Sequence, residues 1–292
     1  MRSDVEFLGL VPTEDPGRFG VVVHDRLARL DGRLYGGAAI AISVAAAEIT
    51  SGRPPLWMTT QFVATAMLGT ELCTHAEVLA AGKRTSQVRV TGTDTDGNVV
   101  FASLGATGNH KEGGITGVFE NPPEVSAPED SEVWTSPFTG MARLAGFAPE
   151  SVPELPPMGF ATAVEMRGAE ILRHPDPGVG RLCVWARRRD RAAVTPALAA
   201  FLSDMVPMSI AAAMGAFVGG TSLDNTIRIG SFVETEWVLI DLRPHMAVGD
   251  YGHGVAHVWS EAGDLLATAS QTAALFSFDV ARFSSIADAP SR

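Results

Sequence analysis

The sequence predicts an α+β fold in which one unit, a helix wrapped by an antiparallel β-sheet, occurs twice in tandem. The first observation is a pair of matching hairpin ends: a polar turn closed by Gly97-Asn98 precedes an apolar strand, and Gly263-Asp264 does the same later. The two glycines lie 263 − 97 = 166 residues apart. The second observation is the order of elements, with one helix per copy. A parallel βαβ sheet would need a helix between successive strands.

The composition is that of a globular protein with a large core. Hydrophobic residues make up 46% of the 292 residues, and charged residues make up 19%. The formal net charge of −11 argues against a nucleic-acid partner, because binding of phosphates requires a basic face. Cys73 and Cys183 form no CxxC motif and are too few for a disulfide framework, so a reducing, cytoplasmic location is expected.

No segment suggests a membrane partner. The first fifteen residues carry acidic side chains and no long apolar run, so no signal peptide is expected. Residues 205–223 are uncharged, but their glycines, serines and alanines make a poor bilayer span, which needs about 20 strongly apolar residues. A helix wrapped by a sheet is the better interpretation.

The first copy is predicted over residues 1–108. Two short strands are expected at 7–11 and 19–23. Residues 36–47 are small and nearly all apolar, which is typical of a helix buried on most sides. Four further strands are expected at 57–67, 71–80, 84–95 and 98–107.

Residues 109–160 are rich in proline and acidic residues and are predicted to be a linker. The second copy follows over 161–280, and then a polar tail over 281–292. Its strands are expected at 164–172, 181–188, 222–232, 235–243, 251–261 and 264–277.

The second copy has a clear helix start. Thr195 is expected as the N-cap and Pro196 at the first helical position, followed by apolar residues at helical spacing. Pro207 is expected to kink this helix. Both copies then have the order strand, strand, helix and four strands, which describes a double hotdog fold.

Several segments have a more specific character. In the second copy they are Phe201-Leu202-Ser203-Asp204, Ser222-Leu223-Asp224-Asn225-Thr226-Ile227-Arg228, Glu236-Trp237-Val238-Leu239, Gly252-His253-Gly254 and Leu266-Ala267-Thr268-Ala269-Ser270-Gln271. In the first copy they are Leu34-Tyr35-Gly36-Gly37 and the strand 97–107. With these segments the chain resembles the TesB-type acyl-CoA thioesterases over nearly its whole length outside the linker and tail.

The resemblance implies a double hotdog enzyme that hydrolyses acyl-CoA to a free acid and CoA. It implies an activated water held by an aspartate of the second helix, a Ser or Thr hydroxyl at the start of the next strand and a glutamine on the last strand. Carried over by motif, these residues are Asp204, Ser222 and Gln271. No metal, cofactor or covalent intermediate is implied, and acyl-CoA is the expected partner.

The same residues suit this chemistry on physical grounds. Apolar neighbours should raise the pKa of Asp204, which suits a general base, although Asp204 could instead cap the helix before Pro207. The Ser222 hydroxyl can donate to and accept from a water, although it could be an ordinary strand-opening serine. Gln271 interrupts an apolar strand and would need a buried partner, unless it faces outward.

The two copies differ at these positions. The offset of 166 places Asp204 opposite Ala38, and Gln271 opposite Gly105. One active site per chain is therefore predicted. The backbone N–H groups of Gly36 and Gly37 at a helix start could bind an oxyanion, or these glycines could serve only tight packing.

Candidates for binding CoA are weaker. Lys83 and Arg84 lie in the turn 81–86, and Arg187 and Arg188 belong to a basic cluster that could meet phosphates, or could simply be a solvated strand end. His253 and His257 share one strand face without an evident third ligand, so metal binding is not expected. The sequence has no GxSxG motif, which disfavours an α/β serine hydrolase.

Two other functions stay open. An enoyl-CoA hydratase of this fold would pair the aspartate with a histidine a few residues later, and none follows Asp204. An acyl-CoA-binding protein with little turnover is suggested by the altered segment 59–62. Association into a homo-oligomer, a dimer or tetramer, through exposed sheet edges is also left open.

Overall fold

The computed structural model describes residues 2–135, 137–146, 156–172 and 180–277. The first half contains α1 (Arg2–Leu8), β1 (Val11–Pro12), β2 (Arg18–Val22), α2 (Gly36–Ser51), β3 (Pro55–Phe62), β4 (Glu71–Ala81), β5 (Thr85–Thr93) and β6 (Val99–Gly108). The second half contains β7 (Glu132–Trp134), α3 (Pro137–Leu144), β8 (Val164–Leu172), β9 (Arg181–Arg188), α4 (Pro196–Leu202), α5 (Val206–Met214), β10 (Val218–Ile229), β11 (Val238–Val248), β12 (Tyr251–Ser260) and β13 (Leu265–Ser277).

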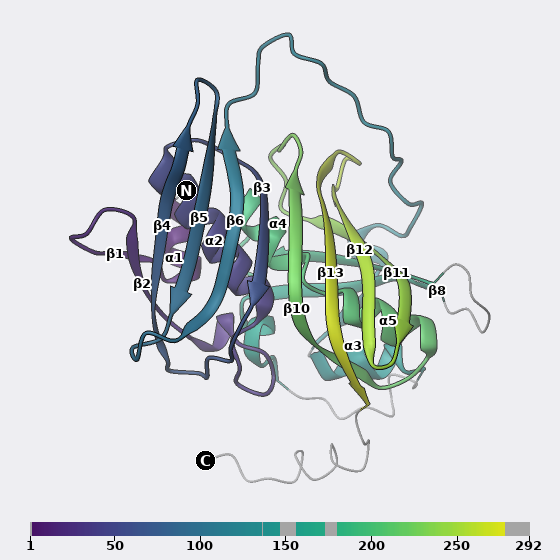
Figure 1. The fold of residues 1–292 in the computed structure, drawn as a ribbon. Helices are drawn as coiled ribbons and strands as arrows, with labels where there is room; N and C mark the ends of the chain where they lie inside the picture. The colour runs from purple at the N-terminus through teal and green to yellow at the C-terminus, as the bar shows by residue number, and fades with distance from the viewer. Residues whose placement is uncertain (1, 136, 147–155, 173–179, 278–292) are drawn as a thin grey trace.

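The strands of both halves form one antiparallel sheet that wraps the helices (Figure 1). Its order is β1-β2-β4-β5-β6-β3-β10-β13-β12-β11-β9-β8-β7. The halves join where β3 pairs with β10, for example at Thr60 and Asn225. α2 packs against the first-half strands, and α5 packs against those of the second half. This architecture confirms the predicted double hotdog fold.

The internal repeat is visible in the register of the sheet. Gly105 of β6 pairs with Val88 of β5, and Gln271 of β13 pairs with Gly254 of β12. Both residues of the second pair follow those of the first by 166 positions. The glycine of each hairpin turn has a left-handed φ, +85° in the first and +89° in the second, which only glycine adopts freely. The hairpins therefore match as the sequence predicts.

The helix α2 is buried along most of its length. Residues 37–47 are all buried, and their small side chains allow the sheet to approach closely. The helix ends at Gly52, which has a left-handed φ of +63° and donates its N–H to the carbonyl of Glu48. The predicted core helix is confirmed.

The second-half helix is divided in two, where the sequence predicts a kink. Thr195 caps α4 by accepting the N–H of Leu198 at 3.1 Å, as expected. A continuous helix through residue 207 would clash with the carbonyl of residue 203, because the proline ring occupies that space. The chain therefore leaves the helix at 203–205 and starts α5 at Val206. Asp204 lies in this break rather than within a helix, which corrects the expectation.

The segment Pro196–Met214 has the length and mean hydropathy (1.6) of a membrane-spanning helix. However, 78% of its 18-residue hydrophobic window is buried inside the fold. These are the properties of a core segment. Of the uncharged residues 205–223, those at 206–214 are helical as predicted, and those from 218 onward belong to strand β10 instead.

The strand predicted at 7–11 is wrong. Residues 2–8 form α1, and only Val11 and Pro12 pair with β2. Phe7 reaches the core, with its ring 5.3 Å from that of Phe201 in an edge-on contact. An apolar run this short does not distinguish a strand from a buried helical turn, and the tertiary contact decides between them.

The segment predicted as a linker has two parts. Residues 109–127 have no helix or strand and cross from β6 to the second half (Figure 1, teal). β7 then pairs with β8, and α3 packs against α5, so residues 132–144 belong to the second half. Residues 147–155 of this segment, and the tail 281–292, lie outside the described residues.

Candidate active site

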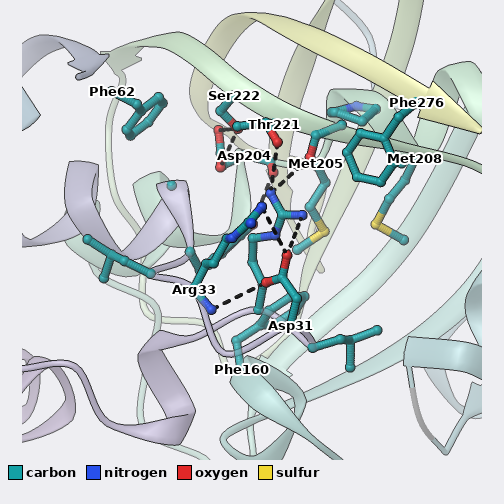
Figure 2. Close-up of a pocket in the computed structure, with 18 of the residues that line it drawn as sticks. Asp31, Arg33, Phe62, Phe160, Asp204, Met205, Met208, Thr221, Ser222 and Phe276 are labelled. Carbon is teal, nitrogen blue, oxygen red and sulfur yellow. Dashed lines mark hydrogen bonds and ion pairs between the residues drawn. The ribbon is translucent and has the colours of Figure 1, made fainter. Parts of the chain in front are cut away.

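A cavity of about 670 Å³ lies between the two halves of the molecule (Figure 2). The first half contributes the segment before α2 and the end of β3, and the second half contributes the helix break and the start of β10. Its aromatic and methionine residues are Phe62, Phe101, Met141, Met158, Phe160, Met166, Met205, Met208, Phe217 and Phe276, with Tyr35 beside them. This lining can hold an apolar group, and methionines adapt to its shape.

The structure brings the three predicted residues Asp204, Ser222 and Gln271 together. The Ser222 hydroxyl lies 3.1 Å and 3.3 Å from the two carboxylate oxygens of Asp204. The Gln271 Nε2 group donates to the Ser222 Oγ at 2.7 Å. In Figure 2, Asp204 and Ser222 point toward each other at one end of the cavity. A chain of hydrogen bonds therefore runs from the amide through the hydroxyl to the carboxylate.

The helix break leaves backbone groups without helical partners, and side chains satisfy them. The N–H of Val206 donates to Gln271 Oε1 at 2.9 Å, so this glutamine also caps α5. The Tyr35 hydroxyl of the first half donates to the backbone carbonyl of Asp204 at 3.2 Å. Both contacts hold the break that presents Asp204 to the cavity.

Gln271 stands behind Ser222 rather than at the cavity surface. Its side chain is 1% exposed, and it is not among the described residues that line the cavity, whereas Asp204 and Ser222 are. Both ends of its amide are occupied by Ser222 and Val206. The geometry makes Gln271 a residue that positions Ser222.

Asn225 is a fourth side chain at this site, and sequence reasoning missed it. Its Nδ2 group donates to Asp204 Oδ1 at 3.1 Å, and the residue is fully buried. Residues three apart on a regular strand face opposite sides, so Ser222 and Asn225 should not converge. A β-bulge makes them converge, because Ser222 pairs with Ala273 and Asp224 pairs with Thr272, which leaves one extra residue between them.

The two glycines at the start of α2 face Asp204. The backbone N–H of Gly37 lowers the pKa of Asp204, which means that it favours the ionised carboxylate. A Cβ on Gly36 would overlap that carboxylate, so the close approach requires glycine. The N-terminus of α2 thus lies against the carboxylate of the second half.

Burial raises the pKa of Asp204 to about 7. Hydrogen bonds from Asn225, Ser222 and the Gly37 N–H, together with the charge of Arg29, act in the opposite direction because they favour the ionised form. Desolvation outweighs these donors. A carboxylate that changes its charge near neutral pH is suited to accept a proton from water.

The first half lacks this set of side chains. Gly105, the counterpart of Gln271, pairs with Met58 in the sheet. A Cβ on Gly105 would come within 2.8 Å of the Met58 sulfur, and Met58 is fully buried. Ala38 is also fully buried. The space that would correspond to a second site is therefore filled by an apolar side chain.

Two of the predicted CoA-binding residues are engaged elsewhere. Arg187 pairs with Glu165 at 2.8 Å and lies over the ring of Trp237 at 4.3 Å. Arg188 is buried and pairs with Asp190. Neither lines the cavity. Their sequence clustering reflects charge pairs on the outer strands of the second half.

The other two predicted CoA-binding residues, Lys83 and Arg84, lie in the exposed turn between β4 and β5 and do not line the cavity either. The cations of the described chain that do line it are Arg29 and Arg33. Sequence reasoning missed both. Their position a few residues before Gly36 was the only signal that could have identified them.

Arg29 and Arg33 differ in how firmly they are held. Arg29 donates to the carbonyl of Gly220 at 3.1 Å and pairs with Asp31 at 3.2 Å. Arg33 has a looser contact with Asp31, at 3.7 Å, and its side chain is 51% exposed. Arg29 therefore ties the first half to the start of β10, while Arg33 keeps most of its hydrogen-bonding capacity for a ligand.

Histidines do not contribute to the cavity in the part of the chain that the structure describes, so no imidazole faces Asp204 there. Within the same residues, no group of three or more His, Cys, Asp or Glu side chains is arranged to hold a metal ion.

Models of two protein domains match the sequence. Residues 23–107 match the acyl-CoA thioesterase N-terminal domain, and residues 125–275 match the acyl-CoA thioesterase C-terminal domain. A comparison with curated proteins finds no match.

Solved structures resemble the molecule over almost its whole length. A Novosphingobium aromaticivorans protein, provisionally described as a thioesterase, is 30% identical with a TM-score of 0.74, covering 91% of this chain and 97% of that one. A hotdog-fold protein of unknown function from Alicyclobacillus acidocaldarius is 19% identical with a TM-score of 0.76, covering 96% and 100%. An acyl-CoA thioesterase II from Mycobacterium marinum is 17% identical with a TM-score of 0.67, covering 95% and 98%. The latter two support the fold alone.

Proposed function

We propose that this chain, which belongs to the acyl-CoA thioesterase family and is a thioester hydrolase, cleaves acyl-CoA by direct attack of water. The reaction takes place at the cavity between the two halves. The observation that carries this proposal is the buried Asp204 carboxylate, which faces an apolar cavity and is held by Ser222. The apolar walls suit the acyl group, and the carboxylate suits the water.

In the proposed reaction, a water in the cavity lies against Asp204 and the Ser222 hydroxyl. Asp204 accepts a proton as the water oxygen bonds to the thioester carbonyl carbon. The tetrahedral intermediate then collapses, the C–S bond breaks, and the CoA sulfur takes up the proton that Asp204 had accepted. The products are a carboxylic acid and CoA, and the carboxylate is regenerated.

Ser222 contributes orientation to this step. It accepts from Gln271 and donates toward Asp204, so its hydroxyl hydrogen and its lone pairs are directed by neighbours. A water next to it meets an oriented dipole rather than a rotating hydroxyl. Such pre-orientation lowers the cost of reaching the transition state.

The first prediction concerns release of free CoA thiol from a series of acyl-CoA substrates. We expect turnover, with kcat/KM rising with pH through a midpoint near 7, because Asp204 must be ionised to accept a proton and burial raises its pKa to about 7. The measurement is a thiol-detection assay between about pH 5 and pH 9. Tight binding of acyl-CoA by calorimetry with no thiol release would instead indicate an acyl-CoA-binding protein.

We also propose that the phosphates of CoA lie beside Arg33. This side chain is half exposed at the cavity, and among the described residues its one ion-pair contact is with Asp31, at 3.7 Å. Arginine binds phosphate well because its planar fork gives paired, charge-assisted hydrogen bonds. Arg29 has fixed partners and provides a constant positive charge nearby.

Replacing Arg33 with Ala should raise the KM for acyl-CoA about tenfold and leave kcat nearly unchanged, because a charge-assisted hydrogen bond to phosphate is lost. The same variant should show an unchanged KM for the matching acyl-pantetheine, which has no nucleotide or phosphate. Arg84→Ala is the control, since Arg84 lies away from the cavity. An equal rise in KM for both substrates would refute a role in phosphate binding.

A further inference from the structure

The site contains a buried amide whose hydrogen bonding is only half satisfied. Asn225 donates through Nδ2 to Asp204, while its Oδ1 is buried without a partner among the described residues. An unsatisfied buried carbonyl costs stability, and an apolar side chain of similar size would avoid that cost. Within the described part of the chain, the one hydrogen bond of this side chain is to the carboxylate of the proposed base.

The surroundings of Asn225 form a polar row across the inner face of the sheet. Asn225 pairs with Gln271 on one side and with Thr60 on the other, and Thr60 pairs with Ser103. All four residues are buried. The Thr60 and Ser103 hydroxyls bond to each other at 2.8 Å. The Asn225 amide bonds instead to Asp204.

The repeat supports a function for this position. In the first half, Gly105 pairs with Met58. In the second half, its counterpart Gln271 pairs with Asn225. Met58 is therefore the first-half counterpart of Asn225. The polar side chain therefore occurs only in the half that carries Asp204. If this position only filled space in the core, an apolar side chain such as methionine would be sufficient, as in the first half.

We propose that Asn225 is a positioning residue of the thioesterase reaction, which fixes the Asp204 carboxylate in the orientation and charge state that remove a proton from water. Asn225 does not line the cavity and therefore acts through Asp204 rather than on the substrate. The β-bulge contributes to this positioning, because it allows Asn225 and Ser222 to contact the same carboxylate. This inference rests on the proposed function.

The charge state follows from the donors around the carboxylate. Asn225, Ser222 and the N–H of Gly37 favour the ionised form against burial, which disfavours it. The other groups that face Asp204 electrostatically are Tyr35 and Arg29 of the first half. The Asn225 hydrogen bond lowers the pKa of Asp204, while burial raises it. Without this donor the pKa should therefore rise, and the carboxyl should keep its proton to higher pH.

The test compares pH profiles of kcat/KM for Asn225→Ala, Asn225→Asp and Thr60→Val with that of the wild type. For Asn225→Ala we expect the midpoint to rise by about one pH unit, a loss of about fivefold at pH 7 that shrinks at high pH, and an unchanged KM. Asn225→Asp keeps the size of the side chain but adds a like charge, so its midpoint should rise further. Thr60→Val removes a neighbouring hydroxyl of the same row and should leave the midpoint unmoved.

A merely structural Asn225 predicts a different result: activity reduced by the same factor at every pH, with an unmoved midpoint, and this would overturn the inference. A second readout does not need turnover. The carboxyl carbon of Asp204, identified in ¹³C NMR by its loss in Asp204→Asn, should titrate at higher pH in Asn225→Ala. If the wild type released no thiol, the proposed function would fail; a working wild type with no shift would refute only the role of Asn225.

Discussion

Asp204→Asn should lower kcat for acyl-CoA hydrolysis by about 10²–10⁴-fold and leave KM almost unchanged, because the amide cannot accept a proton from water. The substitution keeps the size of the side chain. This matters because Ser222 and Asn225 donate hydrogen bonds to the carboxylate and Gly36 lies close against it. The expected loss is therefore one of chemistry and not of shape.

The matched control is Asp224→Asn, the same chemical change on the neighbouring strand β10. Asp224 accepts the N–H of Thr272 at 3.0 Å and has no bond to Asp204, so kcat should stay within about threefold of the wild type. Full activity in Asp204→Asn would remove this residue from the mechanism.

The same variant has a second signature in stability. The unfolded chain ionises Asp204 near its ordinary pKa of 3.8, while burial holds the folded carboxyl protonated to about pH 7. Because the folded state binds the proton more tightly, the stabilising contribution is complete below about pH 3.8 and is lost as pH rises to about 7. The shift corresponds to on the order of 4 kcal/mol.

Asn at position 204 does not titrate, so denaturant unfolding should show the wild type losing stability relative to Asp204→Asn between about pH 4 and pH 8. All other groups titrate alike in the two proteins, and the difference isolates this carboxyl. A difference in unfolding free energy that is independent of pH would mean that the pKa of Asp204 is not raised.

Gln271→Ala should lower kcat by about 10²-fold and destabilise the fold by about 2 kcal/mol, since it removes two bonds with different consequences. Loss of the bond to Ser222 frees the hydroxyl that orients the attacking water. Loss of the bond to Val206 leaves a buried N–H without a partner at the start of α5. Kinetics and thermal unfolding measure the two losses separately.

A double-mutant cycle with Ser222→Ala decides whether Gln271 acts through Ser222. If it does, Gln271→Ala should reduce kcat very little further once the hydroxyl is absent, while the loss of stability should persist in both backgrounds. Additive losses in kcat would show that Gln271 reaches the water or the substrate directly.

The sequence by itself determined the fold, because its evidence was local and repeated. The offset of 166 residues between the hairpins is reproduced by the register of β5 with β6 and of β12 with β13. The run of small residues after Gly36 could form little else than a buried helix. The family resemblance pointed to Asp204, Ser222 and Gln271, which the structure brings together.

Only the tertiary structure decided how these side chains meet. Pro207 predicts a disturbed helix, but Tyr35 and Gln271, each far away in sequence, satisfy the groups that the break exposes. Asn225 reaches Asp204 only because one strand carries an extra residue, and a bulge depends on its pairing with β13. The arginines of the cavity were likewise not predicted, since charge in sequence does not reveal which cations already have partners. Packing of the whole chain determines which side chains of distant segments meet, and the local sequence pattern does not predict these contacts.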